Sequence, residues 1–278
     1  MSALLDRAFM DAVEPLRSPD LGTEHVAGLL YSMVRMTRPR SLLEIGLGYT
    51  TPFLLQALRD NVAEDAEDRR LLQQGTPDDP RLDVLRAESY ERDYAPRLLA
   101  VDDLSDIDTT AAAVPKLLTT LGLDHLYSLY QGSFRGLAST LKSPVVPFDF
   151  VWFDCGSTHE YIDFLSEYWT HIQPCGGILL MHYTYWHWPT IRHRRDGYPI
   201  TAGGIEPSAM LREIKRQHGC LGLDARFEIA SLVEPHKSRQ GSVTLIRRLA
   251  EAPPTGDFDM AAELEARGFP GPYAQFTL

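Results

Sequence analysis

Two glycines follow a short apolar segment, and their spacing is suited to a small-molecule site. Residues 42–45 are typical of a buried strand, and Gly46 and Gly48 allow the chain to turn sharply and a ligand to lie against its backbone. Thr50 or Thr51 can cap a helix that begins directly afterwards. The free N–H groups at the start of that helix would face the same place. The stretch therefore predicts a ligand site at a strand–turn–helix junction.

Acidic side chains end two further apolar segments. Asp102 ends the segment 97–102, and a carboxylate in that place can accept hydrogen bonds from both hydroxyls of a ribose. The neighbouring Asp103 is the alternative. Asp154 ends the segment 148–154 in the same way. Because ligands of open α/β sheets bind outside the carboxyl ends of the strands, we expect these acids near the glycine turn.

Two histidines and a tyrosine are candidates for catalysis. His159 lies in the loop after Asp154, and His182 and Tyr183 end the apolar residues 178–183. A histidine at such a position can act as a general base when the nucleophile arrives protonated. Tyr183 can orient a substrate. Each histidine can equally be a packed or capping residue, and the sequence leaves these alternatives open.

The elements that must position these side chains alternate along the chain. Apolar segments separated by amphipathic helical patterns predict an α/β fold, namely a Rossmann-like, seven-stranded, mostly parallel sheet with a terminal antiparallel hairpin. Helical patterns before residue 40 predict a helical N-terminal preface. The strands are predicted at residues 42–45, 97–102, 127–134, 148–154 and 178–183, with the hairpin at 226–234 and 241–248.

The chain is divided by these patterns into three parts. Residues 1–40 are a helical N-terminal cap, residues 41–250 form the ligand-binding domain, and residues 251–278 are a C-terminal tail rich in Pro and Gly. The helix after the glycine turn is expected to run to about residue 61. Asp102 comes far later than the ~20 residues that usually separate the glycines from the ribose-binding acid, which predicts an insertion at about residues 62–96. The insertion is either a solvated excursion or a flap over the site.

The order of these features resembles that of the class I S-adenosylmethionine (SAM) methyltransferases. Glu44 lies two positions before Gly46, and threonines follow Gly48, which is similar to their first motif, E-x-G-x-G with Ser or Thr after it. Residues 154–161 and 174–182 are similar to the fourth and fifth motifs of the small-molecule branch. The terminal hairpin and the lack of a third glycine distinguish this pattern from that of a dehydrogenase.

The resemblance implies SAM as the cofactor and a role for each candidate residue. Phe134 would stack on the adenine, although a core position for its ring is an equal alternative. His159, His182 and Tyr183 remain the candidate catalytic residues. The cofactor-binding residues would be Glu44, Gly46 and Gly48 with Thr50 and Thr51 around the methionine and ribose, Asp102 at the ribose hydroxyls, Ser133 and Phe134 beside the adenine, and Asp154 near the methionine amino group.

Departures from the family pattern predict that no metal ion takes part. The metal-dependent members hold a divalent cation with hard oxygen ligands near the ends of the fourth and fifth strands. Their patterns are D-G-x-H-x-Y and H-D. Here Asp154 stands two positions further from His159, and Tyr183 replaces the final acid. The loss of that ligand argues against a metal site.

Two segments after the fifth strand bear on the substrate. Residues 183–189 are unusually aromatic, which predicts either a wall of the substrate pocket or a packing or dimer surface. Residues 192–195 are basic and are either a clamp for a substrate carboxylate or a solvated loop.

The resemblance implies transfer of a methyl group from SAM to O or N of a small metabolite, such as a natural-product precursor. An alternative keeps the fold and changes the reaction, as in azetidine-2-carboxylate synthases, which cyclise SAM and release methylthioadenosine. A third possibility is a SAM-binding or nucleotide-binding protein without catalysis. A dehydrogenase is the weakest interpretation.

Composition narrows the partners and the compartment. The 278 residues carry a formal net charge of −11, which argues against a nucleic-acid binder. The three scattered cysteines fit a reducing cytoplasm better than a disulfide framework. The N-terminus lacks the pattern of a signal peptide, and no apolar run approaches the ~20 residues of a membrane span. We therefore expect a cytoplasmic protein, with no membrane partner and a possible homodimer.

Overall fold

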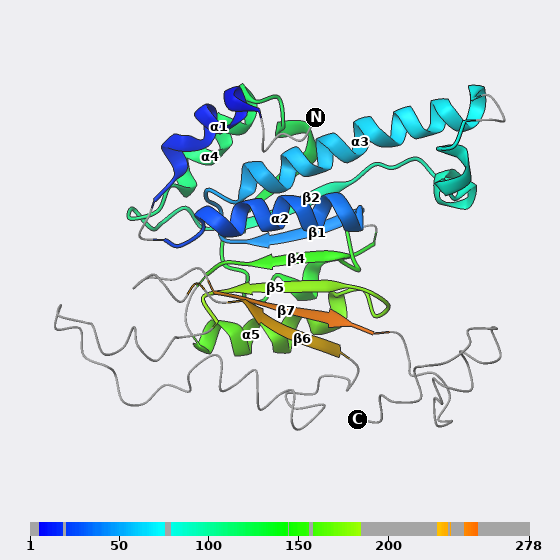
Figure 1. The fold of residues 1–278 in the computed structure, drawn as a ribbon. Coiled ribbons are helices and arrows are strands. Elements are labelled where there is room, and N and C mark those ends of the chain that lie inside the picture. Colours follow the sequence, from blue (N-terminus) through cyan, green and yellow to red (C-terminus); the bar gives the residue numbers. More distant parts are fainter. Residues whose placement is uncertain are drawn as a thin grey trace, which may run out of the picture.

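The computed structural model describes residues 6–18, 21–75, 79–143, 145–155, 158–184, 227–232, 234 and 242–249. Seven strands form one sheet in the order β3-β2-β1-β4-β5-β7-β6 (Figure 1). β1 to β5 run parallel, whereas β7 is antiparallel to both β5 and β6. This arrangement confirms the predicted Rossmann-like sheet and its terminal antiparallel pair. The strands are β1 (Ser41–Ile45), β2 (Arg97–Asp102), β3 (Tyr127–Gln131), β4 (Phe150–Phe153), β5 (Ile178–His182), β6 (Phe227–Leu232) and β7 (Val243–Arg248).

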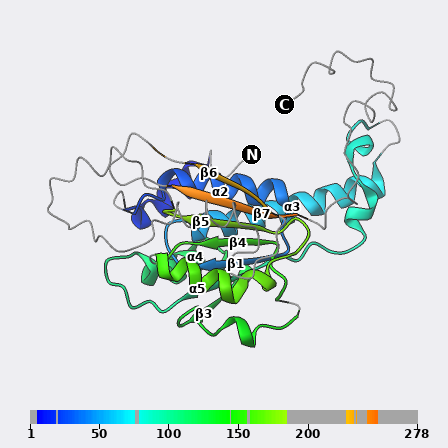
Figure 2. The same ribbon diagram turned by 90° about the horizontal axis from the view of Figure 1, so that it is seen from below.

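Helices cover both faces of the sheet, and alternate strand residues face each helical layer (Figure 1, Figure 2). One core joins α1, α2, α3 and α4 to one face of the sheet, while α5 and the 3₁₀ turn after it close the other. Both central strands β4 and β5 are fully buried, as expected for parallel strands covered on two sides. The helices are α1 (Arg7–Val13), α2 (Glu24–Thr37), α3 (Thr51–Gln74), α4 (Val114–Thr120) and α5 (Thr158–Tyr168).

Helix α3 is longer than predicted. It was expected to end near residue 61, but it continues through 24 residues to Gln74. Charged residues within the predicted insertion pair along this helix, with Arg69 bonded to Asp65 and Arg70 to Glu67. Such pairs at spacings of three and four residues stabilise a helix. The helix therefore ends only where Gly75 interrupts it.

The insertion lies away from the predicted ligand site, so the flap, one of the two alternatives, does not match its position (Figure 1). α3 begins just after the carboxyl end of β1 and rises ~1.5 Å per residue, so its 24 residues span about 35 Å. The five residues of β1 cover only ~17 Å. The excess length carries the insertion past the amino ends of the strands, on the side opposite the arrowheads of β1 and β4 (Figure 1).

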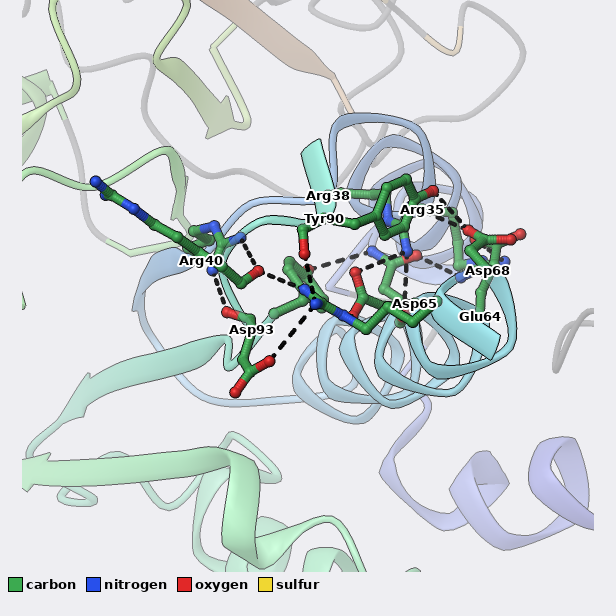
Figure 3. Close-up of polar contacts among 12 residues, drawn as sticks. Arg35, Arg38, Arg40, Glu64, Asp65, Asp68, Tyr90 and Asp93 are labelled. Atoms are coloured by element: carbon green, nitrogen blue, oxygen red, sulfur yellow. Dashed lines mark hydrogen bonds and ion pairs between the residues drawn. The ribbon is translucent and has the colours of Figure 1, made fainter. Parts of the chain in front are cut away.

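A dense polar cluster fixes the insertion to the end of α2 (Figure 3). Arg38 ends α2 in a left-handed conformation, with φ of 46°, and its guanidinium lies over the rings of Tyr90 and Tyr94. The Tyr94 hydroxyl donates to the Pro39 carbonyl at 2.8 Å. We call this group the amino-edge cluster; it comprises Arg35, Arg38, Arg40, Asn61, Glu64, Asp65, Asp68, Arg69, Tyr90, Asp93 and Tyr94.

Among the described residues, no helix combines the length and the apolar character that crossing a membrane requires.

Candidate active site

Gly46 is confined by the backbone of β4. Its φ of +92° is a conformation that side-chain-bearing residues rarely adopt, and a Cβ there would lie 2.3 Å from the Asp154 carbonyl oxygen. Its N–H donates to the Val101 carbonyl at 2.9 Å. The turn therefore passes between the ends of β2 and β4, at the point where the order of the parallel strands reverses on either side of β1. That crevice is where open α/β sheets bind ligands.

Gly48 faces open space. A Cβ built there would meet no atom within 4 Å, in contrast to Gly46. The Gly48 N–H is held by the Thr51 side chain at 3.1 Å, which fixes the turn against the first residue of α3. A ligand can therefore approach the backbone on this side of the turn.

Asp102 joins the glycine turn to the loop after β2. Its Oδ2 accepts from the Leu47 N–H and its Oδ1 from the Leu104 N–H, both at 2.7 Å. A carboxylate has about four acceptor positions, so two remain for a ligand. Asp103, the predicted alternative, is exposed and accepts from the backbone N–H and the hydroxyl of Ser105. Asp102 is therefore the acid that is built into the turn itself.

Glu44 stabilises the glycine turn from within the protein core. Its side chain is fully buried, its Oε1 accepts from the Thr50 hydroxyl at 3.1 Å, and the Trp152 indole N–H donates to the same hydroxyl. Burial raises the pKa of Glu44 to about 8, although hydrogen bonds from the hydroxyls of Thr51 and Thr50 counter the rise. Glu44, Thr50 and Thr51, three of the predicted cofactor-binding residues, are all 0% exposed, so they contribute to the structure of the turn.

Asp154 and His182 meet at the ends of β4 and β5. The imidazole Nδ1 lies 2.6 Å from the Asp154 Oδ1. Burial opposes the charged imidazolium, but the negative charge and the hydrogen bond of Asp154 outweigh it and raise the pKa of His182 above its ordinary value. Nδ1 is thus assigned as the donor, because a carboxylate only accepts. The sequence placed both residues at the sheet edge but did not predict this contact.

Tyr183 leaves β5 in an unusual conformation. Its φ is +57°, its N–H donates to the Ser242 carbonyl at 2.6 Å, and its ring lies edge-on to that of His182. The Tyr161 hydroxyl donates to the His182 carbonyl at 2.7 Å, which also fixes this corner. A left-handed conformation is costly for a residue other than glycine and is often found at functional sites. Tyr161 was missed as a support, although the H-x-Y spacing in the sequence pointed to it.

The remaining predicted residues are less closely associated with the turn. Ser133 is exposed and accepts from the Arg135 N–H. Phe134 is 5% exposed and its ring packs against Phe153, so it occupies the core position that was the alternative to adenine stacking. The side chain of His159, the rest of the aromatic run after Tyr183 and the basic run at 192–195 lie outside the described residues. No group of three His, Cys, Asp or Glu side chains in the described ranges is arranged to hold a metal ion.

A family model described as "Methyltransferase domain" matches residues 43–184, which is just over half of the chain. The chain belongs to this methyltransferase family. The matched range contains the whole glycine turn, Asp102, Asp154 and His182, so the methyltransferase signature and the geometry described above coincide. No curated protein matches the methyltransferase in sequence.

Solved structures of methyltransferases share the fold. The O-methyltransferase TomG from Streptomyces achromogenes, involved in tomaymycin synthesis and solved with SAM, is 18% identical with a TM-score of 0.58, over 90% of this chain and 94% of TomG. An O-methyltransferase from Bacillus cereus with bound SAH is 15% identical with a TM-score of 0.52, over 89% and 91%. The SAH-bound methyltransferase PaMTH1 of Podospora anserina is 17% identical with a TM-score of 0.52, over 88% of each chain. These neighbours confirm the Rossmann-like fold of the chain.

Proposed function

We propose that the protein transfers a methyl group from SAM to an oxygen or nitrogen atom of a small metabolite, without a metal ion. The observation that carries the proposal is the glycine turn at the carboxyl edge of the sheet, with open space beside Gly48 and unused acceptor positions on Asp102. Membership of a methyltransferase family and neighbours that bind SAM or SAH agree with it.

The cofactor is SAM, and the turn is suited to its parts. The ribose hydroxyls would donate to the free acceptor positions of Asp102. The methionine end would lie against the open side of Gly48, toward Asp154 at the end of β4. The carboxylates of Asp102 and Asp154 complement the positive charge of SAM.

The chemical step makes modest demands on the protein. The sulfonium is already a strong electrophile, so holding an acceptor in line with the methyl group supplies much of the rate. A base is needed only when the acceptor arrives protonated. His159 and Tyr183 remain candidates for that role or for orienting the acceptor, and His182 is considered below.

A natural-product precursor is the acceptor class that we favour, because the neighbour TomG acts in the synthesis of tomaymycin. The cytoplasmic location and the homodimer remain predictions from the sequence.

The decisive experiment separates methyl transfer from other chemistry of SAM. The purified protein is incubated with SAM alone and with SAM plus a small-molecule extract, and the products are identified by mass spectrometry. We expect S-adenosylhomocysteine only when the extract is present, together with a product heavier by one methylene. Methylthioadenosine formed without an acceptor would instead indicate cyclisation of SAM. Absence of SAM binding, with Asp102→Ala indistinguishable from the parent, would refute both reactions.

A further inference from the structure

Asp154 and His182 differ in how they face the predicted cofactor site. The side chain of Asp154 is 21% exposed, whereas that of His182 is 6% exposed. Asp154 is also the member next to the glycine turn, because its carbonyl lies where a Cβ on Gly46 would be and its N–H donates to the Ile45 carbonyl. Asp154 is therefore the more exposed member of the pair and follows the strand that contacts the turn, whereas the imidazole is the more deeply buried member.

The imidazole of His182 is enclosed on several sides. Trp152 lies 5.6 Å and Tyr183 6.0 Å away, measured between ring centroids. The backbone carbonyl of His182 is held by Tyr161. Nε2 is buried and makes no hydrogen bond to a described residue, although the backbone of Gly22 is near enough to favour the protonated ring. A general base must reach the proton that it removes. Because Nε2 faces the N-terminal preface, His182 is poorly placed for that role.

Among the described residues, the contact involves only one oxygen of the Asp154 carboxylate. Nδ1 of His182 donates to Oδ1, and no described residue forms a hydrogen bond or ion pair with Oδ2. The hydrogen bond from Nδ1 to Oδ1 fixes the orientation of the Asp154 carboxylate, and with it the direction of Oδ2. An ammonium group is a suitable partner for such an oxygen, because it offers three donors and a positive charge.

We propose that His182 is a positioning residue, which holds the Asp154 carboxylate in place to receive the ammonium group of the SAM methionine, and that it does not act as the base. The inference rests on the proposed function, because it assumes that SAM occupies the glycine turn. It replaces the expectation that His182 abstracts a proton from the acceptor. Asp154 keeps the role that the family resemblance implied, and His182 gains one.

Two ligands distinguish the ammonium contact from the rest of the site. S-adenosylhomocysteine carries the amino acid end, whereas methylthioadenosine has the same adenine, ribose and thioether sulfur without it. Calorimetry gives the dissociation constant of each ligand for the parent and for the variants His182→Ala, His182→Asn and Asp154→Asn. Asp163→Asn is the matched control, because Asp163 is a half-exposed acid whose partner is Arg135. Thermal unfolding of every variant checks that it is folded.

We expect His182→Ala and Asp154→Asn to weaken S-adenosylhomocysteine binding about tenfold or more, as for loss of a charge-assisted hydrogen bond. Methylthioadenosine binding should change less than about twofold. His182→Asn retains an N–H donor near the position of Nδ1, so it should recover most of the affinity. The control should bind both ligands like the parent.

The possible failures are distinguishable. Equal loss of both ligands in His182→Ala and His182→Asn would indicate a structural role alone and overturn the proposal. Parent-like binding of S-adenosylhomocysteine, with a lost catalytic rate in the His182 variants, would overturn it in favour of the base. If the parent protein binds neither ligand, the proposed function itself fails, and the positioning role with it.

Discussion

Gly46 and Gly48 differ in the reason for which each lacks a side chain. Gly46 has a positive φ and lies against the backbone of β4, so its requirement belongs to the fold. Gly48 has open space where a Cβ would stand, so the fold does not require glycine there, and we expect the ligand to require it. We therefore expect Gly46 to matter for the stability of the fold and Gly48 for the binding of the ligand.

Substitution of each glycine by alanine tests this separation. Gly46→Ala should lower the free energy of unfolding by more than about 2 kcal/mol, because the new Cβ meets a backbone oxygen and the conformation is strained. Gly48→Ala should leave stability within about 0.5 kcal/mol and weaken SAM binding at least tenfold. Urea denaturation and calorimetry measure the two quantities. A stable Gly46→Ala, or a Gly48→Ala that binds SAM normally, would contradict the geometry.

Glu44 should make stability depend on pH. Its pKa rises from 4.5 to about 8 on folding, so below pH 4.5 the carboxyl is neutral in both states, and between these values only the unfolded chain ionises. The stabilisation is therefore present at low pH and is lost as pH rises through about 8. Relative to Glu44→Gln, the parent should lose on the order of 4 kcal/mol at most between pH 5 and pH 8. Parallel pH profiles for the two proteins in denaturant melts would show that Glu44 is not buried as an acid.

The sequence was sufficient to predict that the site residues share one edge of the sheet. It was not sufficient to predict which of them are buried. Gly46, Asp102 and Asp154 were predicted together because they follow strands that share an edge. The burial of Glu44 depends on the register of β1 against β4, which sets it beside Trp152. Such cross-strand register is a long-range property, and no local pattern contains it.

At the level of elements, the strands were predicted well and the insertion was not. Apolar runs ending in an acid or a histidine identify buried parallel strands, because both of their faces need apolar residues. Residues 62–74 have too few apolar positions to indicate a packed helix, and their helix is stabilised by charge pairs and by α2 beside it. The direction in which the insertion leaves the sheet follows from helix length, which was underestimated.

Tyr94 tests whether the amino-edge cluster serves stability alone. Burial raises the pKa of Tyr94 to about 12, so its hydroxyl remains a donor to the Pro39 carbonyl. Tyr94→Phe should lower the free energy of unfolding by about 1–2 kcal/mol, because a buried carbonyl loses its partner. The Kd for SAM should be unchanged, since the residue lies beyond the amino ends of the strands. A change in SAM affinity without a change in stability would place the cluster in contact with the site.

At the level of the whole molecule, the charge of the protein favours a cationic cofactor. The chain carries a net charge of −11, and the carboxyl edge includes Asp102, Asp103 and Asp154. SAM carries one more positive charge than S-adenosylhomocysteine. An acidic site therefore attracts the substrate form of the cofactor more strongly than the product form.

Ionic strength should reveal this difference. Raising the salt concentration from about 0.05 M to 0.5 M shortens the screening length from about 14 Å to about 4 Å, which weakens attraction between charges that are exposed to solvent. SAM binding should weaken about threefold more than S-adenosylhomocysteine binding over this range. Calorimetry at each salt concentration measures both constants. An equal response of the two ligands would show that the acidic edge does not discriminate between them.

The distance between the two ends of α3 has a practical consequence. The turn that begins the helix is predicted to bind the cofactor, while the amino-edge cluster contacts α3 at residues 61–69, about 15–27 Å further along at ~1.5 Å per residue. In a background whose natural cysteines are replaced by serine, because Cys175 is itself exposed, a fluorophore on a cysteine introduced at the exposed Glu88 would report the packing of the insertion at a distance from the predicted cofactor site. Folding and ligand occupancy can thus be recorded as two independent signals from one sample, which is what screening for an unknown acceptor requires.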